Sequence, residues 1–169
     1  MDNIKIIENW LEPELIEYLH DQFLYHTPHY YNERSSTDTL FYSHDFNHRD
    51  LLLGHLENKL KTNYLTPKQA FIPAGSNYEI NRIFFNVQHP GMHGSFHVDS
   101  DEEISISASL NISPEDEGGD FVYLENDVEK RVTYKRNSLI LFNSTMPHYG
   151  EAFKKEPRIT LVFHSYVRH

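Results

Sequence analysis

The chain has 169 residues, a formal net charge of −10 and no cysteine. This length suits a single domain with a real hydrophobic core, and the 38% apolar content is that of a folded globular protein. The acidic balance argues against a nucleic-acid groove, which needs a basic face, and the lack of cysteine excludes disulfides, thiolate–metal sites and cysteine nucleophiles.

Targeting and membrane segments are not expected either. The sequence has no long uncharged apolar run, so we expect no membrane span and no membrane partner. The start, Met1-Asp2-Asn3-Ile4-Lys5, lacks a basic region followed by an apolar stretch, so no signal peptide is expected. Cytoplasmic localisation is therefore the default expectation.

The first predicted element is an amphipathic helix over residues 12–26. Pro13 suits the first helical position, and Glu12 and Glu14 favour the positive amino end of a helix. Apolar residues recur at the spacing of one helix face, at Leu15, Ile16, Leu19 and Phe23. A helix that buries this face against a sheet is therefore expected.

A second helix is predicted from Asp50, a good N-cap residue, to about Tyr64. Its apolar residues are Leu51, Leu52, Leu56 and Leu60, and Gly54 weakens the pattern slightly. The stretch between the helices, 27–49, is polar, aromatic and rich in histidine, and we interpret it as a long loop or lid with room for short strands. Two roles stay open for its aromatic residues, a lid over a site or surface packing: His29, Tyr30, Tyr31, Phe41, Tyr42 and His44.

From about Tyr78 onward the pattern changes to short strands separated by turn residues. Strands are predicted at 78–88, 95–99, 103–112, 119–124, 130–134, 138–143, 146–150 and 158–167. In one of them Ile104, Ile106, Ala108 and Leu110 alternate with serines, which is the period of two of a strand. This many short strands favours a mostly β (α+β) sandwich or jelly roll, with the two helices packed on the outside of one sheet.

His97-Val98-Asp99 is the first part of a candidate metal site. Residues two apart in a strand point to one face, so both side chains can reach one ion. The motif alone is weak, because the chain has twelve histidines and one such pair is expected by accident. His48-Arg49-Asp50 is that accident, since Asp50 is placed to cap a helix. A jelly roll with incidental histidines is the structural alternative for the remaining pair.

The context of His97 distinguishes it. A Pro90-Gly91 turn ends six residues before it, and Gly118-Gly119-Asp120-Phe121 and the apolar run 138–142 follow it. His148 then stands near a turn, and Arg158 comes ten residues after His148. Two imidazoles and one carboxylate on one face of an ion leave the opposite face open, which is how proteins build non-haem Fe(II) oxygenase sites.

The order and spacing of these residues resemble the Fe(II)/2-oxoglutarate-dependent dioxygenase superfamily, most closely its prolyl-4-hydroxylase-like branch. The resemblance covers about residues 82–166, half of the chain. It implies a double-stranded β-helix of the cupin-like jelly-roll type within a single domain, 1–169, whose N-terminal helices and lid loop occupy about 1–77 and whose β-helix core occupies about 78–169.

The resemblance also implies the ligands and co-substrates. Fe(II) would be held by His97, Asp99 and His148, with 2-oxoglutarate and O2 as co-substrates and ascorbate as a reductant. Asp99 favours hydroxylation, because related halogenases carry a small residue there. Arg158 would bind the far carboxylate of 2-oxoglutarate, which its planar fork matches, and Thr160 on the same strand face would donate its hydroxyl. The alternatives are a surface arginine after Pro157 and an ordinary strand threonine.

The upstream strand offers further cofactor-binding candidates on one face. Gln88 stands where prolyl hydroxylases often carry a tyrosine that contacts the co-substrate, so it departs from their pattern. Asn86 resembles the asparagine that binds 2-oxoglutarate in the nucleic-acid demethylase branch. Arg82 is interpreted as half of a structural ion pair. Solvated or supporting roles are expected for His89, His93 and His164.

The resemblance implies hydroxylation of an unactivated C–H bond, with release of succinate and CO2. A prolyl residue in a peptide or protein is the first expectation for the substrate. A free amino acid or another small metabolite is the alternative within the same class. A non-catalytic cupin-like protein that binds metal or ligand is the alternative outside it. Asn86 also fits a nucleic-acid demethylase, but the acidic charge opposes a nucleic-acid partner.

Overall fold

The structure, a computed structural model, describes residues 4–34, 40–46, 51–65, 77–102 and 105–167. Its main sheet has seven antiparallel strands in the order β1-β8-β5-β10-β4-β3-β2, and a smaller sheet has the order β7-β6-β9. The strands of the main sheet are β1 (Ile4–Ile7), β2 (Tyr30–Arg34), β3 (Leu40–Asp45), β4 (Tyr78–Gln88), β5 (Ser105–Asn111), β8 (Leu139–Asn143) and β10 (Arg158–Val167). Those of the smaller sheet are β6 (Phe121–Glu125), β7 (Val128–Val132) and β9 (His148–Gly150).

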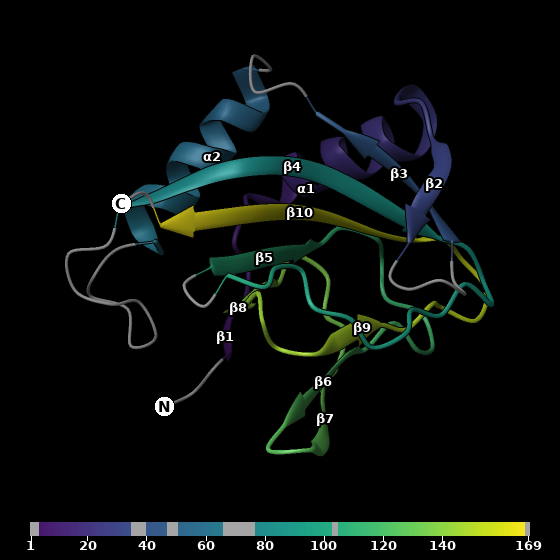
Figure 1. Cartoon of the computed structure of the whole chain (residues 1–169). Helices are drawn as coiled ribbons and strands as arrows, with labels where there is room; N and C mark the ends of the chain where they lie inside the picture. The colour runs from purple at the N-terminus through teal and green to yellow at the C-terminus, as the bar shows by residue number, and fades with distance from the viewer. Residues whose placement is uncertain (1–3, 35–39, 47–50, 66–76, 103–104, 168–169) are drawn as a thin grey trace.

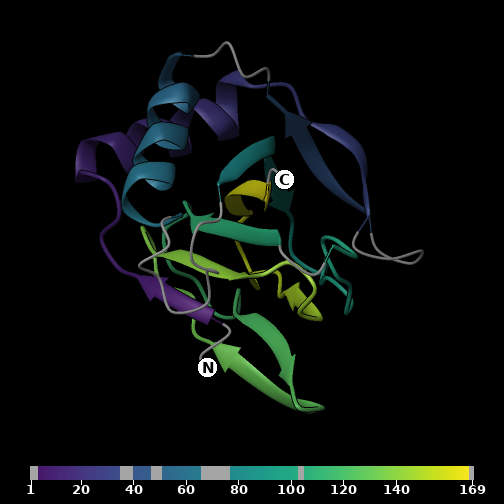
Figure 2. The ribbon, with the colours of Figure 1, turned by 60° about the vertical axis from the view of Figure 1, so that its left-hand side comes forward.

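The elements form three layers, with the helices on one face of the main sheet and the smaller sheet on the other (Figure 1). Figure 2, turned by 60°, shows the same order, with the purple and blue helices on one side and the green β6–β7 hairpin on the other. The predicted mostly β architecture with helices on the outside of one sheet is therefore confirmed. Neither helix in the described part of the chain is long and apolar enough to cross a membrane.

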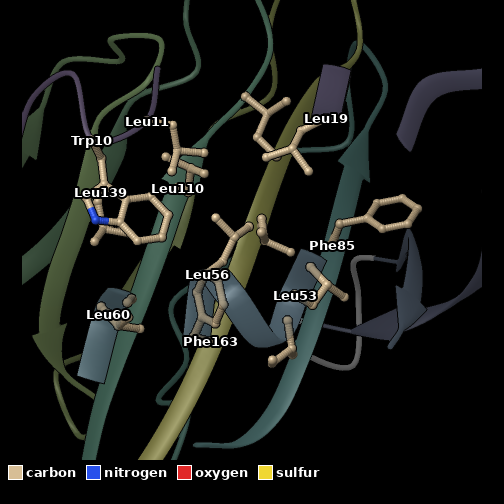
Figure 3. Close-up of a cluster of buried hydrophobic side chains, with 14 of the residues drawn as sticks. Trp10, Leu11, Leu19, Leu53, Leu56, Leu60, Phe85, Leu110, Leu139 and Phe163 are labelled. Atoms are coloured by element: carbon tan, nitrogen blue, oxygen red, sulfur yellow. The ribbon is translucent and has the colours of Figure 1, made fainter. Parts of the chain in front are cut away.

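The first helix, α1 (Pro13–Asp21), begins with Pro13 and runs into a π-helical turn, η1 (Gln22–His26). Together the two segments cover the predicted range, and Ile16, Leu19 and Phe23 are buried as expected. Leu19 lies over the main sheet with its side chain fully buried (Figure 3). The amphipathic pattern therefore predicted both the helix and its buried face.

The second helix, α2 (Leu51–Asn63), buries most of the predicted face and differs from the prediction at its start. Leu51 is 92% exposed, whereas Leu53 is 2% exposed and packs in the core with Leu56 and Leu60 (Figure 3). Leu56 and Leu60 are therefore buried as predicted and Leu52 packs against them, while Leu53 is buried and Leu51 is not. The predicted N-cap, Asp50, lies outside the described residues.

The two central strands, β4 and β10, pair along their whole length and have the predicted bounds. Their alternate residues face opposite ways. One set packs against the helices and is fully or nearly fully buried: Ile83, Phe85, Val87, Ile159, Leu161 and Phe163. The other set lines a pocket on the opposite face: Arg82, Phe84, Asn86, Gln88, Arg158, Thr160, Val162 and His164.

One strand prediction is wrong, the short strands allowed for in 27–49 are present, and one further strand was not predicted. Residues 95–99 form no strand, because β9 is only three residues long and offers one bridge, His97 to His148. The 27–49 stretch contains a hairpin, β2 and β3, and β3 pairs with β4 to extend the main sheet. Strand β1 was not predicted, and it pairs with the distant β8.

Candidate active site

His97 and His148 are brought together by the backbone. The segment that leads from β4 to β5 runs beside β9, where the His97 amide donates to the His148 carbonyl at 3.1 Å and the His148 amide donates to the His97 carbonyl at 2.9 Å. The two rings consequently lie side by side, with centroids 4.5 Å apart. Asp99 completes a set whose ligand atoms all lie within 4.8 Å of one another.

The hydrogen bonds of the two histidines orient their rings. Nδ1 of His97 lies 2.9 Å from the Ser95 carbonyl, and Nδ1 of His148 lies 2.9 Å from the Met146 carbonyl. A carbonyl oxygen only accepts, so each Nδ1 carries the proton and each Nε2 carries the lone pair. The Nε2 atoms lie 3.6 Å (His97) and 3.7 Å (His148) from the oxygens of Asp99. This is the arrangement that a divalent ion requires of two imidazoles and a carboxylate.

The protonation states also suit a metal. Burial lowers the pKa of His148 to about 4, so this imidazole is neutral at physiological pH. Burial by itself would raise the pKa of Asp99, but interactions with His164 and His97 outweigh it and hold the pKa well below its usual range. Neutral imidazole and ionised carboxylate are the forms that coordinate an ion.

Arg158 lies at the other end of the same pocket, at the start of β10, and is 4% exposed. Its Nε donates to the Gly119 carbonyl at 3.0 Å, and one terminal nitrogen donates to Gln88 Oε1 at 2.7 Å. Asp120 and Glu151 act on it electrostatically, but no carboxylate of the described residues forms an ion pair with it. A buried cation without a paired anion is costly, and this one points to an anionic ligand.

Gln88 holds the arginine in place. Its Oε1 accepts from Arg158, while its Nε2 donates to the carbonyls of Met92 at 2.8 Å and Gly150 at 3.0 Å. The amide was expected to bind the co-substrate, and the structure places it directly against the residue expected to anchor that co-substrate. Gly150 leaves the space this arrangement needs, because a Cβ there would lie 2.8 Å from the Arg158 Nη1 and 3.1 Å from Gln88 Oε1.

The pocket between these two ends has a volume of about 250 Å³. Thr160 and Asn86 line its middle, and Asn86 Oδ1 is buried without a hydrogen-bond partner in the described part of the chain. The apolar walls come from several strands: Phe41, Phe84, Val98, Phe121, Phe142 and Val162. All seven predicted site residues line this pocket, with the carboxylate and imidazoles on one side and the guanidinium on another.

Arg82 lies in the same pocket face, where it makes the structural ion pair that was expected. Its Nε lies 2.6 Å from Asp45 Oδ1, and the guanidinium carbon lies 4.0 Å from the centroid of the Phe84 ring. Of the aromatic residues proposed as a lid, Phe41 lines the pocket. Tyr42 packs against His89, and His44 stacks on Tyr30 and Phe85. Because β3 continues the sheet, its alternate residues face different sides.

Sequence reasoning missed several residues around the site. Ser107 donates to Asp99 Oδ2 at 2.6 Å. The alternation of serines with apolar residues in β5 could have placed this side chain on the polar face of the sheet. His164, for which a solvated or supporting role was expected, lies 3.3 Å from the same oxygen of Asp99 on the pocket face of β10. Gly150 gave no signal, because its role depends on a side chain of another strand.

Known structures share this architecture. A 2-oxoglutarate–Fe(II) oxygenase-family oxidoreductase from Burkholderia pseudomallei aligns over 97% of this chain and 85% of its own, with a TM-score of 0.76 at 12% identity. A prolyl hydroxylase from Trichoplax adhaerens, in complex with a peptide fragment of hypoxia-inducible factor, aligns over 98% and 84%, with a TM-score of 0.77 at 13% identity.

A prolyl-4-hydroxylase from Pseudomonas putida aligns over 99% of this chain and 92% of its own, with a TM-score of 0.68 at 16% identity. The chain has the fold of the 2-oxoglutarate/Fe(II) oxygenases. This jelly-roll fold, which the resemblance implied, is therefore confirmed. No protein-family profile matches the sequence, and no curated protein matches it.

Proposed function

We propose that this protein is a 2-oxoglutarate/Fe(II)-dependent hydroxylase. The observation that carries the proposal is one small pocket that holds His97, Asp99 and His148 together with the buried Arg158, which forms no ion pair with a carboxylate of the described residues. An ion and a dicarboxylate are the two ligands that these opposite features call for. In the proposed reaction, substrate C–H, O2 and 2-oxoglutarate give substrate C–OH, succinate and CO2, with one oxygen atom entering the substrate and the other entering succinate.

The donor set fits iron. Two neutral imidazoles and a carboxylate, with no sulfur, are the ligands of non-haem Fe(II) oxygenase sites. When bound, Fe(II) would activate O2, the oxidant for C–H hydroxylation, while 2-oxoglutarate would supply two of the four electrons that O2 accepts. The protein would hold the ion through Nε2 of both histidines and through the ionised Asp99.

The other residues of the pocket would bind and orient the co-substrate. Arg158 would donate two N–H groups to the distal carboxylate, while Gln88 and the Gly119 carbonyl keep the fork from turning. Thr160 would add a hydroxyl donor from the neighbouring position on the same face. The apolar side chains of Phe84 and Val162 would keep water away from the reacting groups.

For the substrate we propose a prolyl residue in a peptide or protein. The pocket is smaller than the roughly 300–1,000 Å³ of sites that enclose drug-sized ligands, so a co-substrate would fill most of it and the substrate would approach from outside. Phe96 and Val98, which flank His97, are both 40% exposed and offer apolar contact to such a chain. The peptide complex of the Trichoplax structure supports the same partner type.

The test is a turnover screen with purified protein, Fe(II), ascorbate and 2-oxoglutarate, in the presence of proline-containing peptides, free amino acids and small metabolites. We expect succinate formation that depends on one substrate class, with a product mass gain of about 16 for one oxygen atom. Asp99→Ala and Arg158→Met are the matched controls and should form no succinate above background.

Two results would revise the proposal. Hydroxylation of a free amino acid alone would keep the reaction and replace the peptide substrate. Wild-type protein that binds Co(II) and 2-oxoglutarate in the same pocket, yet forms no succinate with any substrate class, would indicate a non-catalytic binding protein.

A further inference from the structure

His164 is a half-buried histidine of the pocket that the proposed reaction does not use. It lies on β10, on the same face as Arg158 and Thr160, and its side chain is 18% exposed. The edge of the Phe84 ring packs against it with centroids 5.0 Å apart, which restricts the orientation of the imidazole. His164 does not belong to the group of possible metal ligands formed by His97, Asp99 and His148.

The Nε2 atom of His164 is directed at Asp99. It lies 3.3 Å from Asp99 Oδ2, close enough for a hydrogen bond but not aligned for one, and it has no other hydrogen-bond partner among the described residues. A buried ring nitrogen without a partner is costly, so its position beside a carboxylate is significant.

The two oxygens of Asp99 have different surroundings. Oδ2 accepts the hydroxyl of Ser107 at 2.6 Å, and that hydroxyl lies 2.9 Å from the hydroxyl of Ser144. Oδ2 therefore accepts a hydrogen bond from Ser107 of β5, and His164 of β10 lies beside the same oxygen. Oδ1 lies 3.6 Å from Nε2 of His97, and Oδ2 also lies 3.7 Å from Nε2 of His148.

We propose that His164 is a positioning residue that leaves Asp99 with a single oxygen to offer the metal. In the tautomer with its proton on Nε2, His164 donates to Oδ2. A carboxylate oxygen has about two lone-pair sites, so the hydroxyl of Ser107 and the N–H of His164 occupy both sites on Oδ2. Oδ1 is then the oxygen available for the ion.

The consequence is a constraint on how Asp99 coordinates. Carboxylates bind divalent ions through one oxygen or through two, and two-oxygen binding takes up a position that co-substrate or O2 needs. His164 and Ser107 together prevent the carboxylate from turning into the two-oxygen mode. This inference rests on the proposed function, because it takes Asp99 to be a metal ligand.

The experiment is a Co(II) titration of the purified protein, followed by the visible absorption of the bound ion. Its affinity and band intensity report the number and geometry of ligands without any turnover. His164→Phe keeps a ring against Phe84 but removes the donor. We expect it to weaken Co(II) binding about 10- to 100-fold and to change the band intensity, as is usual when a residue that orients a ligand is lost.

A matched pair separates positioning from packing. His164→Gln carries an N–H at nearly the reach of Nε2, whereas His164→Asn is one methylene shorter. We expect the glutamine variant to bind Co(II) within about threefold of wild type, with the wild-type band, and the asparagine variant to resemble His164→Phe. This pair also decides the question if the phenylalanine variant does not fold. His89→Phe, at an exposed histidine outside the pocket, should bind Co(II) as wild type does.

The outcomes distinguish this inference from the proposed function. Wild-type affinity and band shape in folded His164→Phe, or equal affinity in the glutamine and asparagine variants, would overturn the role of His164 and leave the proposed function intact. Co(II) that fails to bind wild type, or binds Asp99→Ala equally well, would overturn the metal site itself.

Discussion

The two faces of the main sheet are built from the same strands but have opposite properties. Toward the helices, β4 and β10 present fully buried apolar side chains such as Phe85 and Phe163. Toward the smaller sheet they present polar groups such as Arg158 and Gln88, and two buried atoms there, Asn86 Oδ1 and His164 Nε2, have no hydrogen-bond partner among the described residues. Apolar burial stabilises the fold, whereas buried unpaired polar groups cost stability. The first face therefore stabilises the fold. The second face lowers its stability but offers polar groups that a ligand can bind.

The largest effect is expected on the helix-facing side. Phe163 is fully buried and packs edge-on against Trp10, with ring centroids 6.2 Å apart. Phe163→Ala should lower the free energy of unfolding by about 3–5 kcal/mol, because it removes buried surface and leaves a cavity. Urea denaturation followed by circular dichroism measures this. Phe163→Leu, which keeps most of the volume, should lose much less; equal losses would mean that the ring does not carry the packing.

Arg158→Met should separate binding from stability. The substitution removes the guanidinium and keeps the volume, and it should weaken 2-oxoglutarate binding to the Co(II)-loaded protein by about 2–5 kcal/mol. The free energy of unfolding should change little, because relief of a buried charge offsets the loss of two hydrogen bonds. Calorimetric titration of 2-oxoglutarate and urea denaturation measure the two quantities.

The Co(II) affinity of Arg158→Met is the control. It should match wild type, since the arginine makes no contact with the three proposed ligands. Weakening of Co(II) and 2-oxoglutarate binding by the same factor would show that the substitution distorts the pocket as a whole, and the co-substrate anchor would have to be sought elsewhere.

Gly150→Ala should have an intermediate effect confined to the guanidinium. The added Cβ would lie 2.8 Å from the Arg158 Nη1, so the fork must shift. We expect 2-oxoglutarate to bind about tenfold more weakly, or about 1.4 kcal/mol. Co(II) binding through His148, two residues earlier, should be unchanged. Unaltered 2-oxoglutarate affinity would mean that Arg158 binds the co-substrate from a different orientation.

The smallest effect is expected at Thr160, which is 2% exposed in the middle of the pocket. Thr160→Val keeps the shape and removes the hydroxyl. A loss of about 0.5–1.5 kcal/mol in 2-oxoglutarate binding is expected if that hydroxyl donates to the co-substrate. Affinity equal to wild type would make this threonine an ordinary strand residue. Thr160→Ser is the matched variant that restores the donor.

Local patterns predicted the central strands and the set of site residues. The bounds of β4 and β10 could be read from the sequence because both strands are long and alternate over most of their length, up to a register shift after His164. The separations between His97, Asp99, His148 and Arg158 predicted one shared site because they follow the strand order of a known fold.

What the sequence could not supply depends on contacts between distant segments. Strand β1 has only four residues, and its pairing with β8 joins opposite ends of the chain. The bond from Arg158 to Gln88 spans 70 residues, and the approach of His164 to Asp99 depends on the curvature that brings the 97–99 segment over β10. Leu53 is buried and Leu51 is exposed because the position of the main sheet, which the leucine spacing does not specify, decides which side chains at the start of α2 are covered.

The reciprocal backbone pairing of His97 and His148 has a further consequence. Among the described residues, the backbone bonds between the segment 89–102 and β9 are this bridge and the bond from the Gly94 amide to the Gly150 carbonyl, and Phe96 packs on Tyr149. An ion held by both imidazoles would therefore cross-link the segment that carries His97 to strand β9, which carries His148. Loading with Co(II) should slow deuterium uptake at the amides of His97 and His148, far from any change in the helix-packed core.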